Sequence, residues 1–141
     1  MRTEKQKGFT LIELVVVIAL LGILAAFAIP RFASLEREAR TAVVQGLSGS
    51  VRSAAAMAHG LNLATGATAV DMEGNTIDIV FGYPDAETIS LTLADSTGFT
   101  VTDDGTTATF TKDGTTANCQ VTYAEATAAG PPAIAAVTTG C

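Results

Sequence analysis

The stretch GFTLIELVVVIALLGILAAFAIP, residues Gly8–Pro30, decides how this chain is organised. Between Phe9 and Ile29, which are 21 residues including both ends, the single ionisable side chain is Glu13. As a helix this segment would be about 32 Å long at about 1.5 Å per residue, which matches a hydrocarbon core of about 30 Å. The stretch therefore predicts a membrane-spanning helix.

Charge is distributed unevenly on the two sides of this segment. Arg2, Lys5 and Lys7 precede it, which places the N-terminal leader in the cytoplasm and the rest of the chain outside. After Arg52 there are ten acidic residues against one basic residue, Lys112, so this part has a net charge of −9. Such a surface repels phosphate backbones, and no nucleic-acid partner is expected through this part of the chain.

Two simple interpretations of the apolar segment leave features unexplained. An ordinary secretory signal would be cut near Ala26–Ala28, but its apolar region is usually about 7–15 residues long, shorter than this one. A plain membrane anchor accounts for the length and the orientation but not for Glu13. A carboxylate at the centre of a membrane helix costs roughly 2.5–3.5 kcal/mol on insertion scales, so an acid there points to a functional partner.

A third interpretation rests on the motif KGFTLIEL, residues 7–14, which resembles the processing site of type IV prepilins and type II pseudopilins. The resemblance implies that a prepilin peptidase cuts between Gly8 and Phe9 and that Phe9 becomes the N-methylated N-terminus. It also implies that Glu13 of one subunit pairs with the N-terminal ammonium of a neighbour. Gly8 gives the peptidase a flexible, unhindered backbone, and the cut keeps the whole apolar helix in the product.

The apolar pattern continues beyond the membrane segment at steps of three and four, which predicts one helix from about Phe9 to Leu61. Pro30 lies inside this helix, so a kink or a locally melted turn is expected there. In the pilins that the chain resembles, a proline at the matching position is associated with loosening of the helix in the filament. Gly46 and Gly49 are expected to let the sheet approach closely. The face expected to be buried comprises Phe32, Leu35, Ala39, Val43, Leu47, Ser50, Ala54, Met57 and Leu61.

From Ala64 onward, short alternating runs separated by turn residues predict an antiparallel sheet. The expected strands are Ala69–Glu73, Thr76–Phe81, Phe99–Thr102, Thr107–Thr111 and Asn118–Tyr123. The other expectations are a turn at Gly82–Asp85, either a short helix at Ala86–Leu93 capped by Asp85 or a strand at Thr88–Leu93, and a loop at Ala126–Cys141. The predicted class is α+β, with a long N-terminal helix packed on a small antiparallel sheet as in the pilin fold.

The two cysteines, Cys119 and Cys141, both lie in this C-terminal part. If it is exported, they form a disulfide worth roughly 3 kcal/mol in chain entropy, and the alternative is two free thiols in a cytosolic protein. His59 is the one histidine, so a solvated or capping role is expected rather than a metal site. Asp103 and Asp104 leave a weak calcium site as an alternative to plain turn chemistry, and no other cofactor is expected.

The expected organisation is a leader peptide at 1–8, a transmembrane and filament-core helix at 9–30, an amphipathic helix at 31–62 and a β-sheet head at 63–141. Within the pilins, the resemblance is closest to the MSHA-type (mannose-sensitive haemagglutinin) branch of class a. It rests there on Pro30–Phe32, Val44–Leu47, Gly82–Pro84 and the C-terminal cysteine pair.

The resemblance implies a structural subunit of a type IV pilus, not an enzyme, that serves adhesion, surface attachment, biofilm formation or twitching motility. Its expected partners are identical subunits in a helical filament, the prepilin peptidase, the pilus assembly machinery and, before assembly, the inner membrane. The precursor would hold its head in the periplasm, and the assembled pilus would be extracellular. The alternative is a pseudopilin of a type II secretion system, because the processing site is the same in both.

Overall fold

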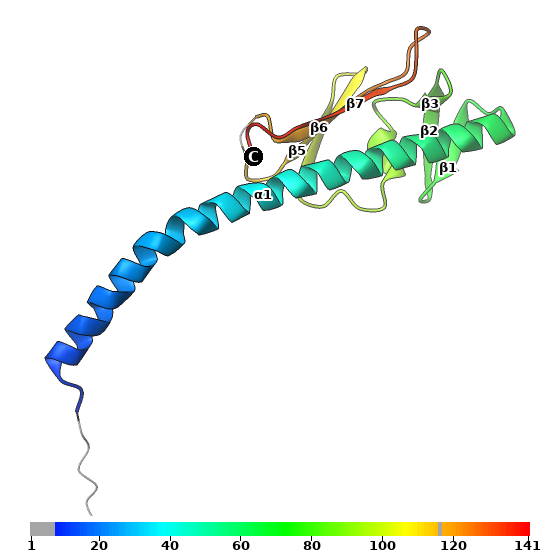
Figure 1. The fold of residues 1–141 in the computed structure, drawn as a ribbon. Coiled ribbons are helices and arrows are strands. Elements are labelled where there is room, and N and C mark those ends of the chain that lie inside the picture. Colours follow the sequence, from blue (N-terminus) through cyan, green and yellow to red (C-terminus); the bar gives the residue numbers. More distant parts are fainter. Residues whose placement is uncertain (1–7, 116) are drawn as a thin grey trace, which may run out of the picture. The chain divides into compact units, whose positions relative to one another are not determined.

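The computed structural model of the protein describes residues 8–115 and 117–141, so most of the expected leader at 1–8 lies outside the described residues. It divides into an N-terminal unit that ends at Arg37 and a C-terminal unit, Glu38–Cys141. A helix is followed by antiparallel strands, which confirms the α+β class (Figure 1). The elements are α1 (Leu11–Thr65), β1 (Ala69–Met72), β2 (Asn75–Val80), β3 (Tyr83–Pro84), the 3-10 helix η1 (Ile89–Thr92), β4 (Phe99–Asp103), β5 (Thr107–Lys112), β6 (Gln120–Ala124) and β7 (Ala133–Val137).

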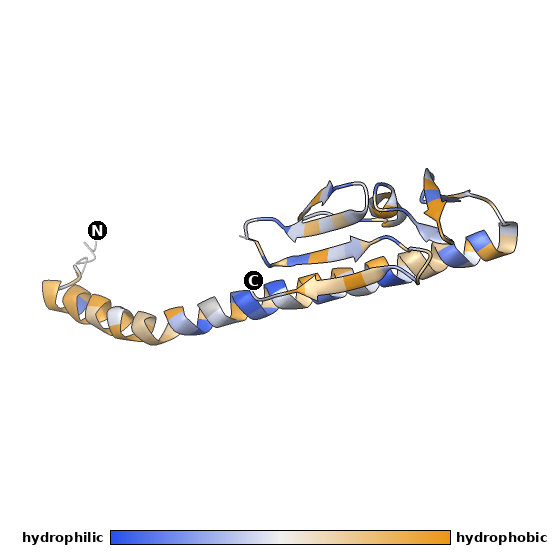
Figure 2. Cartoon of the chain, turned by 90° about the horizontal axis from the view of Figure 1, so that it is seen from above, coloured by the Kyte–Doolittle hydropathy of each residue, from blue (hydrophilic) through white to orange (hydrophobic). Residues whose placement is uncertain are grey.

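The N-terminal unit consists of the apolar part of α1 and the residues that lead into it. Its large apolar side chains are exposed in the single chain. The helix α1 is long and apolar enough to cross a membrane, and Figure 2 shows hydrophobic residues concentrated in its N-terminal part. The helix is continuous through Pro30, so the single chain has no melted turn at this position. The loosening expected inside a filament stays a prediction.

In the C-terminal unit, the strands pack along one side of α1, but not on the face that the sequence pattern predicts. The buried helical residues are Val44, Leu47, Ser48, Val51, Ala54, Ala55 and Ala58. Of the predicted face, Leu47 and Ala54 are buried, whereas Val43 and Met57 are 47% and 59% exposed. The helix is rich in Ala and Val around its circumference, so two apolar stripes overlap and spacing alone does not select one.

The prediction that Gly46 and Gly49 admit the sheet is also wrong. Both glycines are exposed, and a Cβ atom built on either would meet nothing within 4 Å. The close helix–sheet contact is made instead by small alanines, of which Ala55 and Ala58 are almost completely buried.

Two antiparallel sheets, one in the order β1-β2-β3 and one in the order β4-β5-β6-β7, cover this side of the helix. The larger sheet and α1 enclose the main core, which includes Val44, Val51, Phe110, Val121 and Tyr123. A smaller cluster of Ala58, Val70, Met72 and Ile77 joins the helix to the first hairpin. The buried Tyr123 hydroxyl donates a hydrogen bond of 2.6 Å to the Pro84 carbonyl oxygen, which ties the two sheets together.

Two local predictions require correction, and a choice between two alternatives is decided. The turn expected at Gly82–Asp85 lies two residues earlier, at Phe81-Gly82, and Tyr83–Pro84 is the short strand β3 paired with β2. Of the two alternatives before Leu93, the short helix is confirmed, as the 3-10 helix η1. It begins later than expected, and Asp85 lies in the preceding turn, where its Oδ1 accepts a hydrogen bond of 2.8 Å from the Thr88 backbone N–H.

The second correction concerns the expected loop at Ala126–Cys141, which contains the edge strand β7 in register with β6. Its sequence, AIAAV, has weak strand propensity and no polar alternation, so the pairing is decided by the tertiary contact with β6. The disulfide between Cys119 and Cys141 closes this segment onto the start of β6, with Cα atoms 4.8 Å apart, and confirms the expected pairing.

Candidate processing and assembly site

The residues around the expected cut, Gly8–Thr10, precede the first turn of α1 in non-helical backbone. All three are exposed, and the Phe9 side chain is 89% accessible. A protease binds exposed backbone that is free of helical hydrogen bonds more readily than the interior of a helix. The local conformation therefore suits a cut between Gly8 and Phe9 without unwinding of α1.

Glu13 closes the N-terminal end of α1 through a reciprocal capping box with Thr10. Oε2 of Glu13 accepts hydrogen bonds from the Thr10 backbone N–H at 2.8 Å and from the Thr10 hydroxyl at 2.7 Å. In return, the Glu13 backbone N–H donates to Thr10 Oγ1 at 3.3 Å. The pattern Thr-x-x-Glu is a known start signal for helices, so the sequence carries the signal for this cap, although only the assembly role of Glu13 was predicted from it.

The two carboxylate oxygens of Glu13 are therefore not equivalent. Within residues 8–115 and 117–141, the hydrogen bonds to this side chain all go to Oε2, and Oε1 accepts none. The exposed Glu13 lines a shallow groove of about 350 Å³ together with the apolar residues Phe9, Ile12, Val16 and Val17. One oxygen holds the local helix cap, and the other is free to accept a cation from outside the chain.

The predicted site residues belong to two separate groups. Gly8, Phe9, Glu13 and Pro30 all lie in the N-terminal unit, whereas the Cys119–Cys141 disulfide lies in the C-terminal unit. Pro30 is an exposed residue inside α1. At the disulfide, a Cβ atom on Gly140 would collide with the carbonyl oxygen of Ala117, so only glycine allows the C-terminal residues to lie this close to the start of β6.

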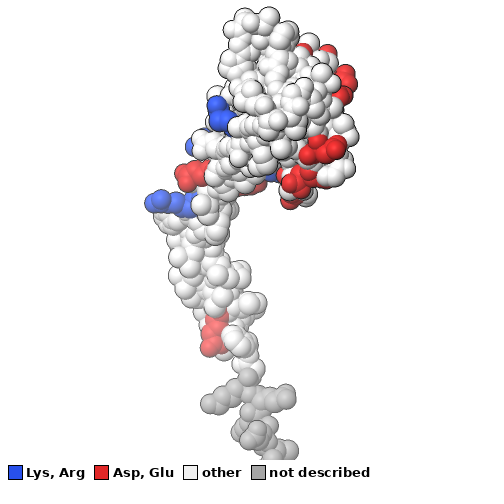
Figure 3. All heavy atoms as spheres, turned by 90° about the vertical axis from the view of Figure 1, so that its right-hand side faces the viewer, with Lys and Arg blue, Asp and Glu red and all other residues white. Residues whose placement is uncertain are grey.

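Asp104 stabilises the β4–β5 turn by accepting hydrogen bonds from residues of the same turn. Oδ1 of Asp104 accepts hydrogen bonds from the Thr106 backbone N–H at 2.9 Å, the Thr106 hydroxyl at 2.8 Å and the Thr107 backbone N–H at 2.8 Å. These donors, above all Thr106, lower the pKa of the Asp104 carboxyl. On the face drawn in Figure 3, acidic side chains gather along one side of the head. Among the described residues no three or more His, Cys, Asp or Glu side chains converge as metal ligands, and the weak calcium site near Asp103 and Asp104 stays a prediction.

The N-terminal segment matches a known sequence family. Residues 4–29 match the prokaryotic N-terminal methylation motif. The chain is 52% identical over 54 residues to the type IV narrow pilus major component PilA5 of Thermus thermophilus, which covers 38% of this chain and 47% of the relative. It is 41% identical over 103 residues to the type IV major fimbrial protein FimA of Dichelobacter nodosus, covering 66% of this chain and 62% of FimA. A fimbrial protein of Pseudomonas aeruginosa is 42% identical over 74 residues, covering 50% and 47%.

These alignments span about half to three fifths of the curated relatives' lengths. No solved structure matches the chain. These three relatives are pilus or fimbrial proteins, and the narrower resemblance to the MSHA-type branch stays a prediction.

Proposed function

We propose, from the premise that this chain belongs to the type IV pilins, that it is a structural subunit of a type IV pilus and has no enzymatic role. The observation that carries the proposal is the geometry at Glu13. Its Oε2 closes the helix, and its Oε1 remains available on exposed apolar surface next to an accessible Gly8–Phe9 bond. The free Oε1 of Glu13 is therefore able to accept a hydrogen bond from a cationic group, and the precursor has no such group at Phe9.

Cleavage after Gly8 supplies that cation. Hydrolysis of the Gly8–Phe9 peptide bond by a prepilin peptidase leaves a carboxylate on the leader and a new amino group on Phe9, which is protonated near neutral pH. N-methylation keeps this charge. In a filament, the Phe9 ammonium of one subunit would donate to Oε1 of Glu13 in its neighbour. Because the pair would be surrounded by apolar side chains, removal of one partner would leave the other unpaired at a cost of about 3–5 kcal/mol.

The exposed apolar surface of the N-terminal unit requires an apolar environment before and after assembly. Its exposed side chains include Leu11, Ile12, Leu14, Ile18, Leu20 and Leu21. Burying each large aliphatic side chain is worth about 1.5–3 kcal/mol, so water is an unfavourable surrounding for the whole segment. The inner membrane provides the apolar environment for the precursor, with the head in the periplasm, and neighbouring helices provide it in an extracellular pilus. Transfer from one to the other would require the pilus assembly machinery.

The pilus is favoured over the pseudopilus of a type II secretion system by two observations. The relatives include a narrow-pilus major component and major fimbrial proteins. The Cys119–Cys141 disulfide closes the C-terminal segment, as is common in the pilins that the chain resembles. The corresponding roles are adhesion, surface attachment, biofilm formation or twitching motility.

Filament formation by Glu13 variants tests this proposal. Cells that lack the protein are complemented with the wild type, with Glu13→Gln or with the control Glu38→Gln, which removes an exposed charge elsewhere on α1. Electron microscopy should show surface filaments for the wild type and the control, and few for Glu13→Gln, although Gly8 is still cut. Abundant Glu13→Gln filaments would refute the role of the carboxylate. Wild-type cells that lack filaments and lose protein secretion on deletion would favour the pseudopilin.

A further inference from the structure

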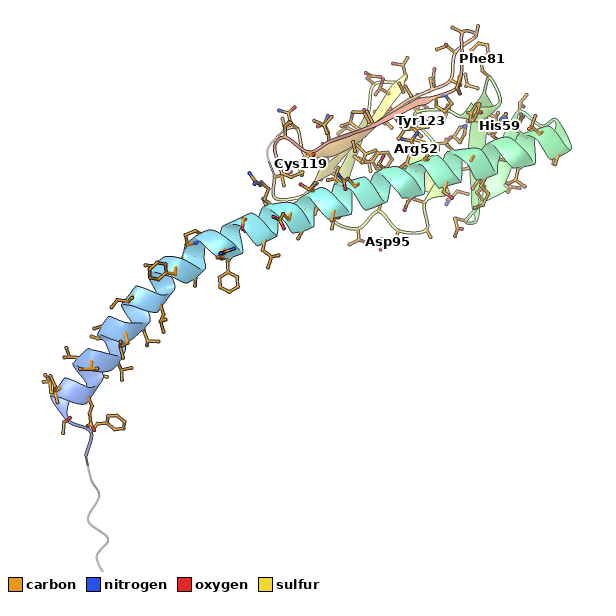
Figure 4. All side chains as sticks on the ribbon, in the orientation of Figure 1. Arg52, His59, Phe81, Asp95, Cys119 and Tyr123 are labelled. Atoms are coloured by element: carbon orange, nitrogen blue, oxygen red, sulfur yellow. A yellow bond between two sulfur atoms is a disulfide. The ribbon has the colours of Figure 1, made fainter. Side chains whose placement is uncertain are left out.

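A pocket in the C-terminal unit lies where α1, the β2–β3 hairpin and the segment leading into β7 meet. Its volume is about 250 Å³, and its lining includes Arg52 from the helix, Tyr83 from β3, and Pro131, Pro132 and Ile134 from the C-terminal segment. We call it the Arg52 pocket. Figure 4 shows Arg52 and His59 on the side of α1 that faces the strands. Arginine and tyrosine are enriched at the centres of protein interfaces, and proline adds a rigid apolar wall.

His59 holds the aromatic wall of this pocket in place. Its ring stacks on Tyr83 with centroids 4.1 Å apart and planes at 4°. Its Nδ1 donates a hydrogen bond of 2.6 Å to the carbonyl oxygen of Gly82. Gly82 has φ +87°, and a Cβ atom there would meet His59 Nδ1 at 3.3 Å, so glycine is required. Tyr83 is thus fixed before any partner arrives, which lowers the entropy lost on binding.

The tip of the same hairpin carries an aromatic side chain that the fold does not explain. Phe81 is 64% exposed and has φ +49°, a left-handed conformation that is unfavourable for a bulky side chain. The neighbouring hairpin has the same turn with a polar residue at the matching position, Glu73, also at φ +49°. Strained backbone and exposed aromatic surface together are typical of binding sites.

Arg52 is a cation with unused hydrogen-bonding capacity. Within the part of the chain that the structure describes, its guanidinium makes one hydrogen bond, of 3.3 Å, to the carbonyl oxygen of Ile134. In contrast, Lys112 donates to the Gly98 carbonyl oxygen at 2.9 Å and lies over the Phe99 ring. A guanidinium has five N–H donors, so Arg52 is able to bind a carboxylate in two-point fashion.

The excess of acidic residues in the C-terminal unit indicates what kind of partner binds Arg52. The C-terminal unit, Glu38–Cys141, contains eleven acidic residues and three basic ones, Arg40, Arg52 and Lys112. Copies of such a unit repel one another when they are packed side by side, unless a cation of one copy contacts an acid of the next.

We infer that the Arg52 pocket and Phe81 form a docking surface for an acidic segment of a second copy of this chain. The inference rests on the proposed function, since a filament is what brings copies together at high local concentration. A carboxylate of the second copy binds the free donors of Arg52, and its apolar neighbours lie against Tyr83, Phe81 and the prolines. The contact joins different surfaces of the two copies, so it is heterologous and repeats along an assembly.

Photocrosslinking of the full chain in filaments tests which partner is present. A benzoylphenylalanine replaces Phe81 or, as the matched control, Glu73 in the β1–β2 turn, and sheared filaments are irradiated. We expect a ladder of covalently linked chains from position 81, with the crosslinked peptide rich in Asp or Glu, and a much weaker ladder from position 73. Crosslinks to a different protein, or none in filaments that are visible by microscopy, would overturn the inference. Absence of filaments from unmodified cells would instead count against the proposed function.

A pair of asparagine variants separates docking from folding. Asparagine tolerates left-handed backbone better than phenylalanine or glutamate, so Phe81→Asn and Glu73→Asn should both leave the thermal midpoint of the chain unchanged or raise it. We expect Phe81→Asn and Arg52→Gln to reduce the sedimentable filament fraction roughly tenfold, as is typical of interface anchors, and Glu73→Asn to leave it intact. Filaments of Phe81→Asn as abundant and heat-resistant as the wild type would contradict the docking role.

Discussion

The stabilisation supplied by the Cys119–Cys141 disulfide follows from the length of the segment that it closes. The two cysteines are 22 residues apart. The chain-entropy relation for a loop of this size gives about 11 cal/mol/K, or about 3 kcal/mol at 25 °C. Reduction should therefore increase the unfolding equilibrium constant on the order of 100-fold, since about 1.4 kcal/mol corresponds to a factor of ten.

Comparison of the oxidised and reduced wild type isolates this effect, because no side chain changes its size. Urea unfolding of the full chain in detergent can be followed by tyrosine fluorescence, which reports on the C-terminal unit because both tyrosines, Tyr83 and Tyr123, lie there. We expect a lower urea midpoint after reduction, and no effect of reductant on a Cys119→Ala/Cys141→Ala control. Equal midpoints for the oxidised and reduced wild type would refute the assignment of the C-terminal segment as a stabilising closed loop.

Four further predictions concern the head. Phe110→Ala should lower the free energy of unfolding by about 3–5 kcal/mol in the same urea assay, because the ring is completely buried, whereas Leu63→Ala on exposed surface should stay within about 0.5 kcal/mol. Tyr123→Phe should cost about 1–3 kcal/mol, because it leaves a buried carbonyl of β3 without its donor. Burial raises the pKa of Tyr123 well above its ordinary value, so the stability that it contributes is present below pH 10 and is lost at higher pH, and ultraviolet titration should show a phenol that ionises late. Hydrogen bonds from Thr106 lower the pKa of Asp104 below its ordinary value of 3.8, so Asp104→Ala should destabilise the β4–β5 turn above pH 4, and the difference from the wild type should disappear as the pH falls through the lowered pKa.

The sequence predicts the elements that have strong local patterns. The apolar run before Pro30 and the hairpin residues Asp103–Gly105 determine their own structure, and the helix and the β4–β5 hairpin were predicted to within a few residues. The processing motif at Gly8–Glu13 was likewise readable, since its residues are contiguous.

The features that were missed depend on tertiary contacts. β7 pairs with β6 despite its poor strand propensity, and Phe81 occupies a turn position for which its own preference is low. Two similar apolar stripes run along α1, and the packing of the sheets determines which of them is buried. None of the three is encoded by local residue type, so sequence pattern alone does not determine them.

Intact-mass analysis of sheared filaments determines where the mature chain begins and whether its two cysteines are joined. We expect a chain that begins at N-methyl-Phe9 and is two hydrogens lighter than its reduced form, because Cys119 and Cys141 are joined. A mature chain that begins at Ile29, as after an ordinary signal cut at Ala26–Ala28, would refute cleavage after Gly8 and the assembly role of Glu13, because such a product has lost both Glu13 and the apolar helix.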